Sequence, residues 1–138
     1  MNEYKSKSNI FSIKVPASYL IEEGGNTISI TDDKNGVGAI NLSAYVIPAT
    51  YNFDVGMELS DFVSSNENAN NAENLLAQVS ADNYEEKEFV LEGQYYWKYW
   101  VLYKNNKAVF GTYNCNFSDR LVEKDIVKEM VDSINILT

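Results

Sequence analysis

The chain has 138 residues, a net charge of −9 and a hydrophobic fraction of 45%, which together predict one soluble globular domain over residues 1–138. It contains no histidine and a single cysteine, which excludes imidazole-based catalytic triads, histidine-ligated metals and an internal disulfide. The acidic balance argues against nucleic acid as a ligand and favours a basic protein as a partner.

The first third of the chain contains three runs in which apolar and polar residues alternate. Alternation places every second side chain on the same face, which is typical of a strand that covers a core on one side. The predicted strands span residues 10–16, 27–31 and 39–47. Pro16 and Pro48 end the first and third strands, because proline cannot donate to a strand ladder.

The middle of the chain predicts helical structure. Asp54 is placed to cap a helix in which Leu59, Phe62 and Val63 recur at helical spacing. An Asn-rich run follows, and asparagine is a poor helix former, so we expect a break and then a second helical piece over residues 72–79. One continuous helix is the alternative, because the apolar residues on both sides of the run keep roughly one face.

The last third predicts three strands and a helix. The strands span residues 84–91, 95–104 and 107–117. Ser118 or Asp119 is expected to cap the closing helix. Its apolar stripe consists of Leu121, Val122, Ile126, Val127, Met130, Val131 and Ile134.

This order of elements predicts the α+β class, with helices packed on a central antiparallel sheet of about six strands. Four features follow one another along the chain: the segment Phe11-Ser-Ile-Lys-Val-Pro16, a mid-chain helix, an aromatic hairpin ending in Gly111-Thr-Tyr-Asn-Cys115, and a helix running into Met130-Val-Asp-Ser-Ile134. In this the chain resembles the PsbP-like (MOG-type) fold family, in its uncharacterised bacterial branch. The resemblance implies an α/β/α sandwich and a binding protein. It implies no ligand residues, because no binding motif is matched.

The hairpin over residues 95–117 carries aromatic side chains on both faces. A two-residue Asn105-Asn106 loop predicts a register in which Trp100 lies opposite Gly111 on an apolar core face. The other face mixes aromatic rings with amide side chains, as binding surfaces do. The predicted partner-binding residues are Tyr95, Trp97, Tyr99 and Phe110. The alternative is that these four side chains pack beneath a helix.

Few residues suggest catalysis. Alternation places Glu86 and Glu88 on one strand face, which we expect to be solvated. Cys115 is expected to be a small buried hydrophobic residue, because neither histidine nor a basic residue adjoins it in sequence. No catalytic residue, metal ligand or cofactor is predicted.

The sequence therefore favours a non-enzymatic, protein-binding module of a small cytoplasmic bacterial protein, either an immunity factor or a chaperone for a secreted effector. The polar N-terminus lacks the apolar region of a signal peptide, and no apolar run reaches the about 18 residues of a membrane helix, so no membrane contact is expected. A second interpretation is a small-molecule carrier with an apolar pocket beneath the aromatic hairpin. A third is a carboxylate-dependent hydrolase. The oligomeric state stays open.

Overall fold

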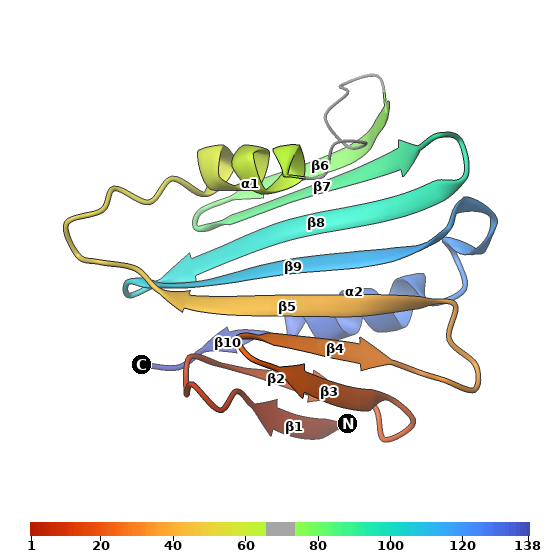
Figure 1. Cartoon of the computed structure of the whole chain (residues 1–138), viewed down its shortest axis with the longest axis horizontal. Helices are drawn as coiled ribbons and strands as arrows, with labels where there is room; N and C mark the ends of the chain where they lie inside the picture. The colour runs from red at the N-terminus through yellow and green to blue at the C-terminus, as the bar shows by residue number, and fades with distance from the viewer. Residues whose placement is uncertain (66–73) are drawn as a thin grey trace.

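The computed structural model describes residues 1–65 and 74–138, which form two antiparallel sheets and two α-helices (Figure 1). The larger sheet contains, from edge to edge, β3 (Leu20–Gly24), β4 (Thr27–Thr31), β5 (Gly38–Val46), β9 (Lys107–Asn116), β8 (Tyr95–Lys104), β7 (Tyr84–Leu91) and β6 (Leu75–Ala81). The smaller sheet contains β1 (Asn2–Lys5), β2 (Phe11–Val15) and β10 (Asn135–Ile136). The helices are α1 (Val55–Ser64) and α2 (Lys124–Asp132), with one 3-10 turn, η2 (Phe117–Asp119), before α2.

The β8–β9 hairpin forms the centre of the larger sheet, in the predicted register. Asn105 and Asn106 both adopt left-handed backbone conformations, with φ of 50° and 60°, as a two-residue type I′ turn requires. Trp100 lies opposite Gly111, and the fully buried indole occupies the space above the glycine. The length of one short turn therefore determines which aromatic side chains of the hairpin lie on which face of the sheet.

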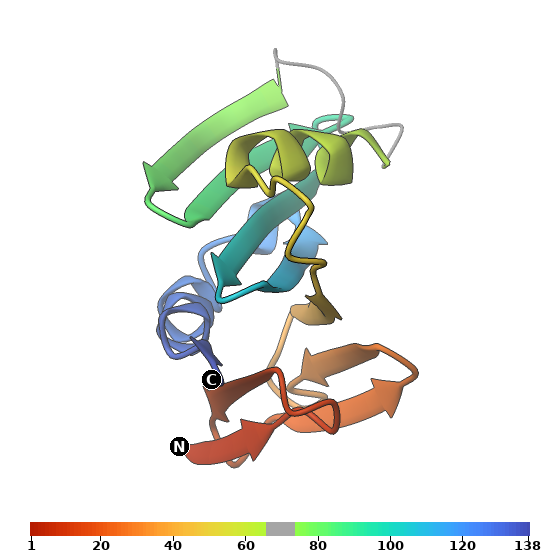
Figure 2. The same ribbon diagram turned by 90° about the vertical axis from the view of Figure 1, so that its left-hand side faces the viewer.

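Each face of this hairpin is covered along part of its length, and the two helices lie on opposite sides of the larger sheet (Figure 2). On one side a large apolar cluster joins Trp100 to Ile13 of β2 and Met130 of α2. On the other side a smaller cluster joins Val101 of β8 to Leu59 of α1. The predicted α+β architecture with helices on both faces is confirmed, with seven strands in the larger sheet in place of about six.

The helix predicted over residues 72–79 is wrong for the part that the structure describes. Leu75–Ala81 form strand β6, which pairs antiparallel with β7, while residues 72–73 and most of the Asn-rich run lie outside the described residues. Every described residue of β6 is exposed. No buried face therefore imposes the alternation of apolar and polar residues that identifies a strand in the sequence. The turn at Asp82-Asn83, with φ of 64° at Asn83, is the signal for a hairpin here.

The closing helix begins later than predicted, at Lys124. Ser118 and Asp119 belong to η2, and the exposed fractions of Leu121 and Val122 are 64% and 61%. The residue before the helix is Glu123, whose side chain does not cap its own helix. Its carboxylate instead accepts hydrogen bonds from β5 and the preceding loop, so a tertiary contact overrides the local start signal.

The first helix begins as predicted. The carboxylate of Asp54 accepts a hydrogen bond from the backbone nitrogen of Met57 at 3.1 Å, and Leu59 and Val63 are buried.

Strands β1 and β3 were not predicted, because most of their residues are exposed and carry no alternating pattern. Neither helix of the described ranges has the length and hydropathy to cross a membrane.

Candidate functional site

Part of the mixed aromatic face of the hairpin lies beneath α1. Tyr99 is only 2% exposed and packs edge-on against Phe62 of α1, with ring centroids 5.6 Å apart. Phe110 is half-buried, and its ring centroid lies 5.2 Å from that of Phe62. Tyr99 is therefore not part of an exposed surface, because α1 covers it, and Phe110 mainly supports the helix.

The same face is open at the end of the sheet where β8 begins and β9 ends. A hollow of about 520 Å³ lies there, and we call it the hairpin-end hollow; its lining includes Glu92, Tyr95, Trp97, Asn114 and Asn116. Tyr95 is 44% exposed. The indole of Trp97 is half-buried and stacks on Tyr99, with centroids 5.5 Å apart and planes 17° apart. Tyr95 and Trp97 are thus the two predicted site residues that the structure brings together at a surface.

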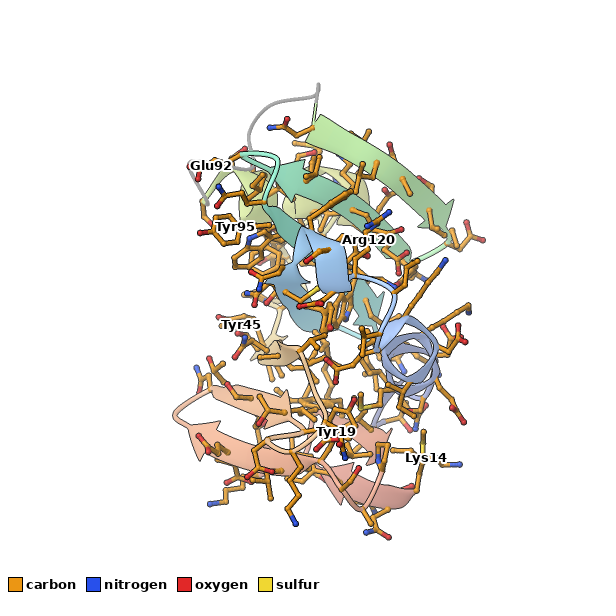
Figure 3. The ribbon with its side chains drawn as sticks, turned by 90° about the vertical axis from the view of Figure 1, so that its right-hand side faces the viewer. Lys14, Tyr19, Tyr45, Glu92, Tyr95 and Arg120 are labelled. Carbon is orange, nitrogen blue, oxygen red and sulfur yellow. The ribbon has the colours of Figure 1, made fainter. Side chains whose placement is uncertain are left out.

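An unusual turn places a carboxylate beside these rings. The β7–β8 turn uses left-handed conformations at both central residues, with φ of 55° at Glu92 and 65° at Gly93. Glycine adopts this conformation freely, whereas glutamate does so at a cost in conformational energy, and strained residues cluster at functional sites. Glu92 and Tyr95 extend from the same side of the ribbon (Figure 3). Within the described residues, Glu92 is the one charged side chain in the lining, so the hollow combines negative charge with aromatic faces.

The opposite face of the hairpin holds a second cavity, of about 280 Å³, between strands β6–β9 and helix α2. We call it the α2-side cavity. The Glu86 carboxylate lies 3.3 Å from the Lys98 ammonium, with side-chain exposures of 12% and 13%, and accepts a hydrogen bond from the Tyr84 hydroxyl at 2.6 Å. Glu88 accepts a hydrogen bond from the Tyr96 hydroxyl. The expectation that Glu86 is solvated is wrong, because this cavity lies under α2. Charged as well as apolar groups line the space beneath the hairpin.

The tyrosines of the α2-side cavity are neutral hydrogen-bond donors. Burial raises the pKa of the Tyr84 and Tyr96 phenols, and hydrogen bonds to Glu86 and Glu88 raise it further. Burial also raises the pKa of Tyr113, followed by its hydrogen bond to Glu123. A raised pKa means that the folded state holds these protons more tightly than the unfolded chain does.

We therefore expect the fold to lose stability in alkaline solution. The stabilisation is fully present below the unfolded tyrosine pKa of about 10 and is lost as the pH rises through the higher folded values. An absorbance titration of tyrosinate should show Tyr84, Tyr96 and Tyr113 ionising only as the protein unfolds. In Tyr84→Phe the increase in tyrosinate absorbance that accompanies unfolding should be smaller by the contribution of one tyrosine. Complete ionisation of all tyrosines with the fold intact would contradict this expectation.

The remaining ionisable groups serve the fold. Glu123 is 4% exposed and is satisfied by four donors, a role that no sequence pattern signals. Cys115 is buried as predicted, and burial raises the pKa of its thiol. In the part of the chain that the structure describes, no group of three or more Cys, Asp or Glu residues is arranged to hold a metal ion.

No protein-family model matches the chain, and no curated protein does. Solved structures do match. The solution structure of cyanobacterial PsbP (CyanoP) from Synechocystis sp. PCC 6803 superposes with a TM-score of 0.72 at 12% identity, covering 98% of this chain and 91% of that chain. The chain has a PsbP/Mog1-like fold.

Two further structures share the PsbP/Mog1-like fold. The Ran-binding protein Mog1p of Saccharomyces cerevisiae gives a TM-score of 0.64 at 10% identity, covering 98% of this chain and 94% of that chain. A crystal structure from Bacteroides thetaiotaomicron gives a TM-score of 0.66 at 15% identity. The match covers 99% of this chain and 48% of that one, so this chain spans about half the length of the Bacteroides protein. The resemblance seen in the sequence is confirmed at the level of the fold.

Proposed function

We propose that this protein is a non-enzymatic binding module that holds a basic segment of another protein in the hairpin-end hollow. The observation that carries the proposal is that Glu92, at a positive φ, lines the same hollow as the exposed Tyr95 and the half-buried Trp97. Mog1p, a Ran-binding protein, has the same fold, so the fold is compatible with binding another protein. A cytoplasmic bacterial immunity factor or effector chaperone would be a module of this kind.

The chemistry of the hollow suits an arginine or lysine side chain. A cation over the face of Tyr95 or Trp97 gains about 0.5–2 kcal/mol from the ring quadrupole, depending on how far it is desolvated. The Glu92 carboxylate supplies the opposite charge at the rim, and the amides of Asn114 and Asn116 can donate and accept hydrogen bonds. The net charge of −9 accelerates encounter with a basic partner, and added salt weakens that effect.

Affinity capture from native lysate tests this function with three variants. The wild-type protein should retain a stoichiometric, basic protein, and Trp97→Ala or Tyr95→Ala should reduce its retention by about 30-fold, the loss typical of a binding hot spot. Tyr51→Ala is the matched control, because Tyr51 is also exposed, at 52%, but lies on the segment before α1. Retention that is equal for all variants, or a wild type that retains no such protein, would refute the proposal.

A second candidate function, the carriage of a small molecule, is favoured by one specific observation. The α2-side cavity lies on the other face of the hairpin from the hairpin-end hollow and has a separate set of lining residues. Substitutions at Tyr95 or Trp97 therefore leave its lining intact, and the two functions can be tested independently.

A further inference from the structure

The α2-side cavity has the size of a small metabolite. Its volume of about 280 Å³ corresponds to about nine water molecules at their liquid volume, slightly below the usual range of ligand sites. One wall is helix α2, which contributes Val127 and Val131, and the edge strand β6 contributes Val79. These three valines give the cavity an apolar side, on which a short hydrocarbon chain can be buried.

The floor of the cavity alternates in charge. Glu88 lies opposite Lys98 in the β7–β8 register, and Lys98 is paired with Glu86 at 3.3 Å. A nearly buried ion pair of this kind adds little to stability, because the desolvation of both charges offsets their attraction. Glu88 receives a hydrogen bond from Tyr96, but no ion pair to it is formed among the described residues. Its carboxylate can therefore accept further hydrogen bonds.

The rim of the cavity is basic. Arg120, Lys124 and Lys128 line it from α2 and the turn before α2, and Arg120 lies beside α2, across the sheet from Tyr95 (Figure 3). Lys128 is paired with Asp132 at 2.6 Å. Arg120 donates to the backbone oxygen of Phe117. Within the described ranges neither Arg120 nor Lys124 forms an ion pair, so two positive charges remain without an opposite charge.

We propose that the α2-side cavity binds a free α-amino acid with an apolar side chain. The ammonium group donates hydrogen bonds to Glu88, the carboxylate is held by Arg120 and Lys124, and the side chain lies against the three valines. A ligand with only negative charge would be repelled by Glu86 and Glu88, and one with only positive charge by Arg120 and Lys124. A zwitterion complements both sets of charges. This site goes beyond the proposed protein-binding function and shares no residue with the hairpin-end hollow.

Saturation-transfer NMR and calorimetry with leucine, valine and methionine test the site. Each probe should bind the wild-type protein at concentrations up to about 10 mM, a weak affinity suited to so small a ligand. Leucinamide lacks the carboxylate and 4-methylpentanoate lacks the ammonium group, so each should bind at least about tenfold more weakly than leucine. Glucose is the neutral polar probe and should not bind. No binding of any of the three amino acids, or equal binding of leucine and its two analogues, overturns the proposal, as does preferential binding of glucose.

Substitutions then test which charged side chain of the cavity contacts which charged group of the ligand. Glu88→Gln should weaken leucine about tenfold, because only leucine carries the ammonium group. It should not weaken 4-methylpentanoate, because the substitution removes a charge that repels this anion. Lys124→Met, at an exposed position, should weaken leucine. It should not weaken leucinamide, because the substitution removes a charge that repels this cation. Lys14→Met removes a positive charge from an exposed position on β2 and is the matched control. Binding that is the same in all three variants overturns the proposal. Trp97→Ala should not alter leucine binding, so failure of the protein-binding function remains distinguishable.

Discussion

Replacing Gly111 with alanine should destabilise the protein by about 3 kcal/mol, the upper range for inserting atoms into a packed core. A Cβ atom at this position would lie 2.1, 2.3 and 2.4 Å from the Cε2, Cζ2 and Nε1 atoms of Trp100. Trp100 has no exposed surface, so the indole cannot move aside without displacing the core between the sheet, α2 and β2. Denaturant unfolding, followed by circular dichroism, measures the change in the free energy of unfolding.

Gly24→Ala is the matched control for this substitution. Gly24 also lies in a strand, and a Cβ atom there would meet no described atom within 4 Å. Its free energy of unfolding should therefore change by no more than about 0.5 kcal/mol. Shortening the indole in Trp100→Leu should relieve part of the Gly111→Ala effect, so the two substitutions should be non-additive. Equal stability of Gly111→Ala and Gly24→Ala would contradict the packing of Trp100 over Gly111.

The Trp100–Gly111 pair could be predicted from sequence because the cause is local. Two asparagines between two runs of alternating residues fix the loop length, and the loop length fixes every cross-strand pair of the hairpin. The same reasoning places Tyr99 and Trp97 on one face, but it does not say where a helix will lie on that face. Phe62 of α1 covers Tyr99 and leaves Tyr95 exposed, which depends on a contact distant in sequence.

The charged sites were less accessible to sequence reasoning. Glu86 and Glu88 were placed on one face by alternation, but the cavity above them exists because α2, some forty residues later, packs beside that strand. Glu92 carries a different kind of signal. It precedes Gly93 in the three-residue connection between β7 and β8, and glutamate is an unfavourable residue at a positive φ. Such a conflict between residue and turn type is what marks the hairpin-end hollow in the sequence.

Replacing Glu123 with alanine should destabilise the protein by about 4 kcal/mol, because it removes a buried acceptor shared by four donors. The Oε1 atom accepts from the backbone nitrogens of Val37 and Gly38 at 2.9 and 3.0 Å and from the Tyr113 hydroxyl at 2.9 Å. The Oε2 atom accepts from the Tyr19 hydroxyl. A buried carboxylate without a paired cation is tolerated only when donors of this kind replace its hydration.

Glu123→Gln separates charge from hydrogen bonding at this position. Its amide oxygen can keep the three bonds that Oε1 accepts, and the Tyr19 hydroxyl can rotate to accept from the new amide nitrogen. The loss should therefore be about 1–2 kcal/mol. Glu129→Ala, on the exposed side of α2, should change stability by no more than about 0.5 kcal/mol. If Glu123→Ala unfolds at the same denaturant concentration as Glu129→Ala, Glu123 does not hold the β4–β5 loop to the start of α2. The late start of that helix would then need another cause.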